Sequence, residues 1–422
     1  MLYVTQAIIT VSQVGEGRDK IFTIPFVTEY EIESSWDMLT STMKLKLPKK
    51  CRVKQDTGEW LYLSNDSGYN SNIGGFTEAK PLFMRGDMIY FSVGYLSRVD
   101  GKEHLIMTEP YLFQGFISRV APGMTYEIEC EDAMWLLKQI PTPIGQKQWE
   151  GMTVNQIVQK IYNDAKSNKL SKLYQYVQKG VNFTIQNTNE GTVTDVIFNV
   201  ENMWTQGESL AEFLGRLKRQ YKLNSYFRGT DLRLGMPAYI SGDYVEHTLD
   251  FQQNIIENSL EWNRRDDQII SAVVTSHYDV EKSTDNSMTK DNKTKRVRKS
   301  TQILVYFSAG EFSYTVKQKG VQLPPNEVGQ RYDLVCNDAV ANPEALFAWA
   351  KSVLLERYYD GLSGDITTFA LPLMLHGHGV LLKDKLIPER NGKAFYIRKM
   401  VYKGSTSQGF RQIATLHRMR PR

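Results

Sequence analysis

Cysteine is scarce in this 422-residue sequence, and its few positions are far apart. The three residues, Cys51, Cys130 and Cys336, are odd in number and form no CxxC pair. Such a set does not build a disulfide framework, and without a CxxC pair no zinc knuckle is expected. The scarcity fits folding in a reducing cytoplasm.

Long apolar runs and catalytic signatures are also missing. No stretch of 18 apolar residues occurs, so no membrane span is expected. The N-terminal residues alternate like a strand and lack the basic start of a signal peptide. There is no GxSxG, no phosphate-binding loop ending in Lys-Ser/Thr and no HExxH. We therefore expect no catalytic residue, no cofactor and no bound metal.

Charge of one sign is in excess only in one segment. Residues 281–300 hold seven Lys or Arg and three acids, which equals the net charge of +4 for the whole chain. The segment has no aromatic residue and predicts a flexible loop between strands. Its cations are too dense to be paired by the three acids, so we expect a solvated loop or a contact with nucleic acid, a lumen wall or an acidic partner. The candidate residues are Lys290, Lys293, Lys295, Arg296, Arg298 and Lys299.

What is present is mostly β-strand pattern. Residues 1–145 contain short alternating runs separated by Gly, Pro and Asn, with a long polar insertion at about 52–80, and predict a barrel or sandwich. Residues 146–250 are helix-rich, and residues 251–422 return to strands with one inserted helix at 343–359. The fold class is thus α+β and mainly β, with two β units around a helical one.

The helical unit carries the clearest local pattern. Leu210, Phe213, Leu214, Leu217 and Tyr221 form one apolar stripe at helical spacing. Ser209 with Glu212, and likewise Thr153 with Gln156, have the spacing of a capping box. A Gly-containing turn after the helix that begins near Ser209 predicts a hairpin over 224–235. By itself, this pattern is typical of a generic α/β packing unit.

Several candidate sites have a plainer structural interpretation. Glu127, Glu129 and Glu131 alternate with apolar residues as the wet face of a strand, although with Asp132, Asp266 and Asp267 they are also the candidates for glycosidase-type chemistry. The triplet at 85–87 reads RGD, but it opens a strand, which argues against an adhesive role. His376 and His378 lie in HGHG, which is more typical of a turn than of a metal site.

An ordered series of motifs resembles the late control protein D and VgrG hub family, the baseplate hubs of contractile phage tails and related injection machines. The stretches are SSWDMLTSTMKLKLP (34–48), GDMIYFSVGY (86–95), YLFQGFISRV (111–120), YEIECEDAMWLLK (126–138), ESLAEFLGRLKRQYKLNSYFRGTDLRLG (208–235), GDITTFALPLMLHGHGVLLKD (364–384), GKAFYIRKMVYKG (392–404) and GFRQIATL (409–416). Each motif alone is weakly specific, because strands and glycines are common. The resemblance depends on the motifs occurring in the family's order along nearly the whole chain.

The resemblance implies a structural role without catalysis. It implies two β-barrel domains, 1–145 and 251–422, and a homotrimer whose six barrels adapt a hexameric tail tube to a trimeric central spike. Implied partners are the tube, the spike, baseplate wedge proteins and passing DNA, in a virion tail assembled in the host cytoplasm. Because the sequence stops after the last predicted strand, the spike is expected to be a separate protein.

Two other functions stay open at this point. The chain could be a tail-associated cell-wall hydrolase that uses the carboxylates named above. It could also be a host-receptor-binding tail protein, with Trp60, Tyr62 and Tyr69 of the insertion as exposed aromatic contacts.

Overall fold

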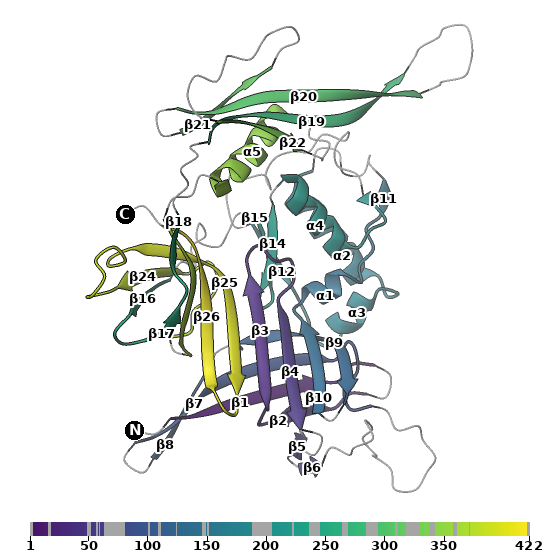
Figure 1. The fold of residues 1–422 in the computed structure, drawn as a ribbon. Coiled ribbons are helices and arrows are strands. Elements are labelled where there is room, and N and C mark those ends of the chain that lie inside the picture. The colour runs from purple at the N-terminus through teal and green to yellow at the C-terminus, as the bar shows by residue number, and fades with distance from the viewer. Residues whose placement is uncertain are drawn as a thin grey trace.

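The structure is a computed structural model of the 422-residue chain and consists mainly of antiparallel strands (Figure 1). It describes residues 3–15, 18–48, 52–55, 58, 60–62, 81–99, 102–108, 111–123, 125–145, 149, 152–187, 205–221, 223–235, 245–263, 269–283, 294–308, 311–317, 330–336, 342–357, 361–370 and 372–419. The prediction of a mainly β fold with a helical unit between β-rich parts is confirmed.

The described residues of the N-terminal β unit form ten strands. They are β1 (Tyr3–Ser12), β2 (Ile21–Ile24), β3 (Glu29–Ser35), β4 (Thr42–Pro48), β5 (Arg52–Gln55), β6 (Trp60–Tyr62), β7 (Met88–Val99), β8 (Lys102–Met107), β9 (Phe113–Pro122) and β10 (Thr125–Glu131). Alternate residues of β4 and β10 are buried, as expected for a sheet with one wet face.

In the part of the C-terminal β unit that the structure describes there are seven strands: β16 (Glu246–Asp250), β17 (Ile255–Asn258), β18 (Glu261–Asn263), β23 (Gly361–Phe369), β24 (Gly379–Lys383), β25 (Ala394–Ser405) and β26 (Gly409–Met419). β16 lies before the boundary predicted at 250, but it pairs with β24 and so belongs to this unit.

The two β units are continuous with each other. β25 pairs with β3 from Lys399 opposite Ser35 to Ser405 opposite Glu29, and one 17-stranded sheet results. Side chains of both units share a single hydrophobic core, which contains Met43 and Ile128 together with Ile366. Among the described residues, no pairing closes either unit into a complete barrel, so the predicted pair of separate barrels is observed as one extended sheet.

The helical unit lies beside this sheet (Figure 1). It consists of α1 (Met134–Leu137), β11 (Ile144–Gly145), α2 (Val154–Ser167), α3 (Lys172–Val177), β12 (Thr184–Asn187), β13 (Thr205–Gln206), α4 (Leu210–Tyr221), β14 (Asn224–Arg228) and β15 (Asp231–Gly235). The predicted capping boxes are confirmed, since Thr153 and Gln156 bond reciprocally, as do Ser209 and Glu212. The predicted hairpin is β14–β15.

The α4 stripe is buried as the spacing predicted. Leu210, Phe213, Leu214 and Leu217 are fully inaccessible, and α4 packs on β14, α1 and α5. Burying four such side chains stabilises the fold by roughly 1.5–3 kcal/mol each. The side chain of Tyr221 lies outside the described residues.

Residues 269–357 form a separate layer inside the predicted C-terminal unit. Its sheet has the order β21–β20–β19–β22, and α5 packs against it (Figure 1). The elements are β19 (Ile269–Ser283), β20 (Thr294–Ser308), β21 (Glu311–Val316), β22 (Gln330–Cys336) and α5 (Pro343–Arg357). The core of this layer is continuous with that of the helical unit, and the same cluster also includes Met88 of β7 and Phe116 of β9. The predicted helix 343–359 is thus present over Pro343–Arg357, with the Asn342 side chain accepting from the N–H of Glu344 at 2.9 Å.

The prediction of a loop over residues 281–300 is wrong at both ends of the segment. Glu281–Ser283 belong to β19 and Thr294–Ser300 to β20, and the two strands pair up to Ser283 opposite Thr294. The backbone hydrogen bonds of a long ladder hold these residues as strand although their composition is polar. Residues 284–293 lie outside the described part of the chain.

Candidate functional site

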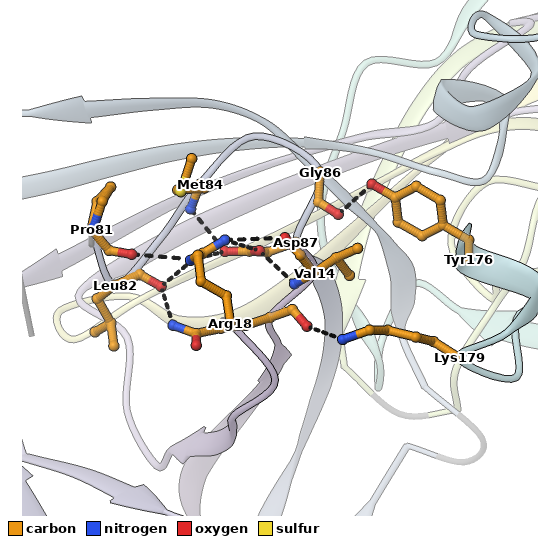
Figure 2. Close-up of polar contacts among 10 residues, drawn as sticks. Val14, Arg18, Pro81, Leu82, Met84, Gly86, Asp87, Tyr176 and Lys179 are labelled. Carbon is orange, nitrogen blue, oxygen red and sulfur yellow. Dashed lines mark hydrogen bonds and ion pairs between the residues drawn. The ribbon is translucent and has the colours of Figure 1, made fainter. Parts of the chain in front are cut away.

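Asp87, which directly precedes β7, forms a buried ion pair with Arg18 (Figure 2). Asp87 is fully buried and accepts two bonds of 2.7 Å from the guanidinium of Arg18. The same carboxylate accepts the N–H groups of Val14 at 3.0 Å and Met84 at 2.8 Å. Arg18, 5% exposed, also donates to the carbonyl of Leu82 at 3.1 Å. We call these five residues the Asp87 cluster, and it fixes the β1–β2 turn against the residues before β7.

Helix α3 is attached to the Asp87 cluster (Figure 2). The Tyr176 hydroxyl donates to the carbonyl of Gly86 at 2.9 Å, and Lys179 donates to the carbonyl of Gln13 at 3.0 Å. Gly86 has φ +96°, and a Cβ there would meet the Tyr176 hydroxyl at 2.7 Å, so both conformation and space require glycine. Because Asp87 is buried and paired, the RGD triplet is part of the fold and its carboxylate is not offered to a receptor.

A second buried carboxylate, Asp132, joins the same β unit to α1. It accepts the N–H of Ser41 at 2.8 Å and the N–H of Met134, the first residue of α1, at 3.0 Å. Burial raises the pKa of Asp132 to about 7, although these hydrogen bonds act in the opposite direction. Its carboxylate thus caps the start of α1 from a buried position, and the burial is what raises its pKa.

The other carboxylates predicted for glycosidase-type chemistry lie on a charged sheet surface. Glu127, Glu129 and Glu131 alternate along β10 with buried residues, as the wet-face interpretation predicted. Glu129 pairs with Arg119 at 3.4 Å and Glu131 with Lys138 at 2.5 Å. Asp266 and Asp267 lie outside the described residues.

Charges of opposite sign stand in register across five strands of this surface. One row runs Lys403, Glu31, Lys44, Glu129 and Arg119, on β25, β3, β4, β10 and β9 respectively. A second row contains Glu29, Lys46 and Glu127. Basic and acidic strands therefore alternate, and cross-strand pairs of opposite charge stabilise such a sheet modestly. We call these the charged rows.

The charged rows also connect the two β units. Lys403 pairs with Glu31 at 3.3 Å, Lys399 with Glu33 at 2.5 Å, and Arg398 with Asp37 at 2.6 Å. Each pair joins a cation on β25 to an acid on β3 or just after it. With the shared core and the β3–β25 ladder, these contacts hold the two β units together as one body.

The six predicted contact cations do not form one loop. Lys290 and Lys293 lie outside the described residues, whereas Lys295, Arg296, Arg298 and Lys299 are on β20. Register places Arg296 opposite Glu281 and Arg298 opposite Asp279, so two of them have an acid directly across the ladder. Lys295 stands opposite Lys282 and Lys299 opposite Tyr278. The β19–β20 hairpin lies at the opposite end of the molecule from the N-terminal sheet (Figure 1).

The histidines of HGHG lie in a turn before β24, as predicted, and both are buried. His378 Nδ1 accepts the N–H of Leu375 at 3.3 Å and lies 2.9 Å from Nε2 of His247. A backbone N–H can only donate, so His378 Nδ1 is an acceptor and His247 donates through Nε2–H. Burial lowers the pKa of His247, and it lowers the pKa of His376 well below the usual value.

The described residues offer neither a metal-binding group of side chains nor a membrane-spanning helix. No three His, Cys, Asp or Glu side chains in the described part of the chain are grouped so as to hold a metal ion. None of the described helices combines the length and hydropathy needed to cross a membrane. Trp60 and Tyr62 are on β6, but their side chains lie outside the described part of the structure. Tyr69 is not among the described residues.

Sequence reasoning missed the role of the two buried aspartates. In the sequence, Asp87 and Asp132 were noted only as parts of motifs, and Asp132 also as one of a group of acids. A usable signal existed, because each is an acid at a strand boundary next to a run of apolar residues. Its partner could not be inferred, since Arg18 lies 69 positions from Asp87 and Ser41 lies 91 from Asp132.

Comparison with known proteins places this fold among tail proteins. No family model matches the sequence, and no curated protein is similar to it in sequence. The solved structures of similar fold include a tail protein from Neisseria meningitidis, with TM-score 0.54 and 13% identity over 99% of this chain and 96% of that one. The 43 kDa tail protein of prophage MuSo2 from Shewanella oneidensis gives TM-score 0.53 and 13% identity over 98% of each chain.

A third similar structure is part of a VgrG complex. A chain of the Francisella PdpA–VgrG complex gives TM-score 0.51 and 8% identity over 98% of this chain and 58% of that one. The protein therefore has the fold shared by these tail proteins and this VgrG complex, over essentially its whole length. The resemblance predicted from the sequence motifs is confirmed at the level of the fold.

Proposed function

We propose that this chain is a structural hub subunit of a phage tail or related injection machine. The observation that carries the proposal is the fold: two β units and a helical unit, in an order that matches whole tail proteins from end to end. In this role the protein is a homotrimer in the virion tail, assembled in the host cytoplasm. Its six β units contact a hexameric tube on one side and a trimeric spike on the other, with baseplate wedge proteins around them.

The internal construction supports a mechanical role. The β3–β25 ladder and the shared core join the two β units within each chain, and the Asp87 cluster attaches the helical unit to them. A subunit that transmits force between a tube and a spike needs such joints, because separately hinged domains would move independently. Of the carboxylates considered for hydrolysis, Glu129 and Glu131 pair with cations on the sheet surface and Asp132 caps α1, which favours the structural role over the hydrolase.

Mass photometry and light scattering of the purified chain test the oligomeric state. We expect a particle of three times the 48.5 kDa chain mass at micromolar concentration. A chain that stays monomeric there, with or without a spike protein, contradicts the hub.

A peptidoglycan turbidity assay tests the hydrolase alternative, and we expect no clearing. Clearing that disappears in Glu127→Gln or Asp266→Asn would instead support a hydrolase.

We further propose that the basic part of the β19–β20 hairpin contacts a polyanion, either passing DNA or an acidic partner surface. The β19–β20 register decides which cations to replace. Lys295 and Lys299 have no acid directly opposite on β19, whereas Arg296 and Arg298 do. Particles with Lys295→Ser/Lys299→Ser should deliver less genome and depend less on salt. The matched control, Arg296→Ser/Arg298→Ser, should have the smaller effect. Equal, parental behaviour of both, and of a variant with serine also at Lys290 and Lys293, would leave the hairpin without this role.

A further inference from the structure

A cavity of about 210 Å³ lies where the two β units meet. One part of its wall comes from the N-terminal unit and includes Ala7 of β1 and Tyr30 of β3. Another part comes from the end of β25 and the start of β26 and includes Gly404 and Phe410. A cavity of roughly 150 Å³ can hold benzene, so the space between the two units is large enough for a small molecule.

Tyr30 places an unused hydrogen-bond donor in this wall. The residue is only 5% exposed, and in the described part of the chain its hydroxyl has no hydrogen-bond partner. A buried hydroxyl without a partner is unfavourable, so a group that accepts a hydrogen bond from it is favoured. Burial also raises the pKa of Tyr30, and the neighbouring Tyr95 adds to this effect. The hydroxyl therefore keeps its proton and is able to donate at physiological pH.

Packing fixes the position of the Tyr30 ring. The ring lies directly on Gly404, where an added Cβ would be 2.1 Å from a ring carbon and 2.6 Å from the hydroxyl oxygen. Phe91 contacts the ring in an edge-to-face arrangement with 4.7 Å between the centroids, and Phe410 does so with 6.0 Å. Gly404 and Phe410 are themselves wall residues, so the hydroxyl is held beside the wall of the cavity by its neighbours.

The remainder of the wall favours a neutral ligand. Of the described residues that form it, none is charged. Phe26 and Phe410 contribute aromatic surface, while Thr5 and Ser405 contribute hydroxyl groups. A charged ligand would lose water here without meeting an opposite charge, which is unfavourable. Small-molecule sites commonly combine such an apolar wall with a few polar groups that fix the orientation of the ligand.

We propose that this cavity binds a small neutral molecule in which a compact apolar group, such as one aromatic ring, carries an acceptor oxygen. The oxygen accepts a hydrogen bond from the Tyr30 hydroxyl, and the apolar group packs against Phe26 and Phe410. Because the ligand contacts both β units, its binding stabilises the joint between them and the folded protein as a whole. This role goes beyond the hub function and does not depend on it.

Two probes of nearly equal shape test the site in the purified full-length chain. Acetophenone carries a carbonyl oxygen next to a single ring, and ethylbenzene has the same ring without an acceptor. Affinities are measured by ligand-observed NMR titration of the parent and of Tyr30→Phe, which removes only the hydroxyl. We expect Tyr30→Phe to bind acetophenone about three- to tenfold more weakly than the parent, which corresponds to one net hydrogen bond. The affinity for ethylbenzene should not fall.

Two further variants separate this cavity from other apolar sites. Tyr90→Phe removes a hydroxyl from β7 outside the cavity wall and should leave both affinities at the parental level. Ala7→Leu places a larger side chain in the wall and should abolish binding of both probes. Acetophenone should also raise the thermal unfolding midpoint of the parent but not that of Ala7→Leu. Circular dichroism confirms that each variant is folded.

Three results would overturn the assignment. They are a parent that binds neither probe up to the solubility limit, a Tyr30→Phe variant with parental affinity for acetophenone, and an Ala7→Leu variant that still binds both probes. If Ala7→Leu does not fold, the comparison of Tyr30→Phe with Tyr90→Phe decides by itself. None of these results bears on the hub, which is tested by the oligomeric state.

Discussion

The Asp87 cluster and the charged rows use the same kind of interaction in opposite settings. In the cluster, one Arg18–Asp87 pair is almost fully buried, with two bonds of 2.7 Å and further bonds from the backbone. In the rows, pairs such as Lys46–Glu29 and Lys403–Glu31 are about half exposed. Water and salt screen the exposed pairs, whereas the charges of the buried pair are stabilised by each other and by the backbone groups around them, without water.

The difference teaches that the number of ion pairs is a poor guide to what holds this molecule together. Breaking a buried pair leaves an uncompensated charge in the core, which costs several kcal/mol. Breaking an exposed pair returns two ions to water, which costs little. The cluster therefore fixes the architecture, while the rows set the character of a surface and the alignment of strands.

The largest effect is expected for Asp87→Ala. It leaves the Arg18 guanidinium buried without its carboxylate and also removes the acceptor for the N–H groups of Val14 and Met84. The free energy of unfolding should fall by about 3–5 kcal/mol, measured by urea denaturation. Arg18→Met/Asp87→Leu should recover part of this loss, because it removes both charges together. A loss below about 1 kcal/mol for Asp87→Ala would place the buried pair in the same class as the surface pairs.

An intermediate effect, dependent on pH, is expected for Asp132. Its pKa is raised from the ordinary 3.8 to about 7, so the folded state holds the proton that the unfolded state releases. The stability that this group contributes is present below about pH 4 and is lost as pH rises through 7. Asp132→Asn cannot titrate. The stability of the parent relative to this variant should therefore fall by roughly 2–4 kcal/mol between pH 4 and pH 8.

The comparison at each pH must be a difference between parent and variant, because other groups act in the opposite direction. The lowered pKa values of His247 and His376 make both proteins less stable as pH falls below about 6.5. This contribution cancels in the difference, since both histidines are retained. A parent-minus-variant difference that is flat from pH 4 to pH 8 would show that Asp132 stays ionised throughout.

Local features of this fold could be predicted from the sequence, and long-range joints could not. The α4 stripe and the Ser209–Glu212 cap follow from residues within a few positions of one another. The β3–β25 ladder joins residues more than 360 positions apart, and no local pattern encodes that register. The same reason hid the Arg18 partner of Asp87. The polar composition of residues 294–300 predicts a loop, but the partner strand β19 supplies the hydrogen bonds that keep β20 extended there.

The smallest effect is expected in the charged rows. Lys403→Ala removes one end of a five-strand row and leaves Glu31 with Lys44 still directly opposite it on β4. Because the lost pair is about half exposed, unfolding should become easier by less than about 1 kcal/mol. A double-mutant cycle with Glu31→Ala isolates the pair, and its coupling should shrink further as salt shortens the Debye length from about 10 Å at 0.1 M to about 3 Å at 1 M. A coupling as large as the Asp87 effect and insensitive to salt would mean that the row acts as a cooperative network. The contrast between the two regions would then lie in connectivity and not in burial.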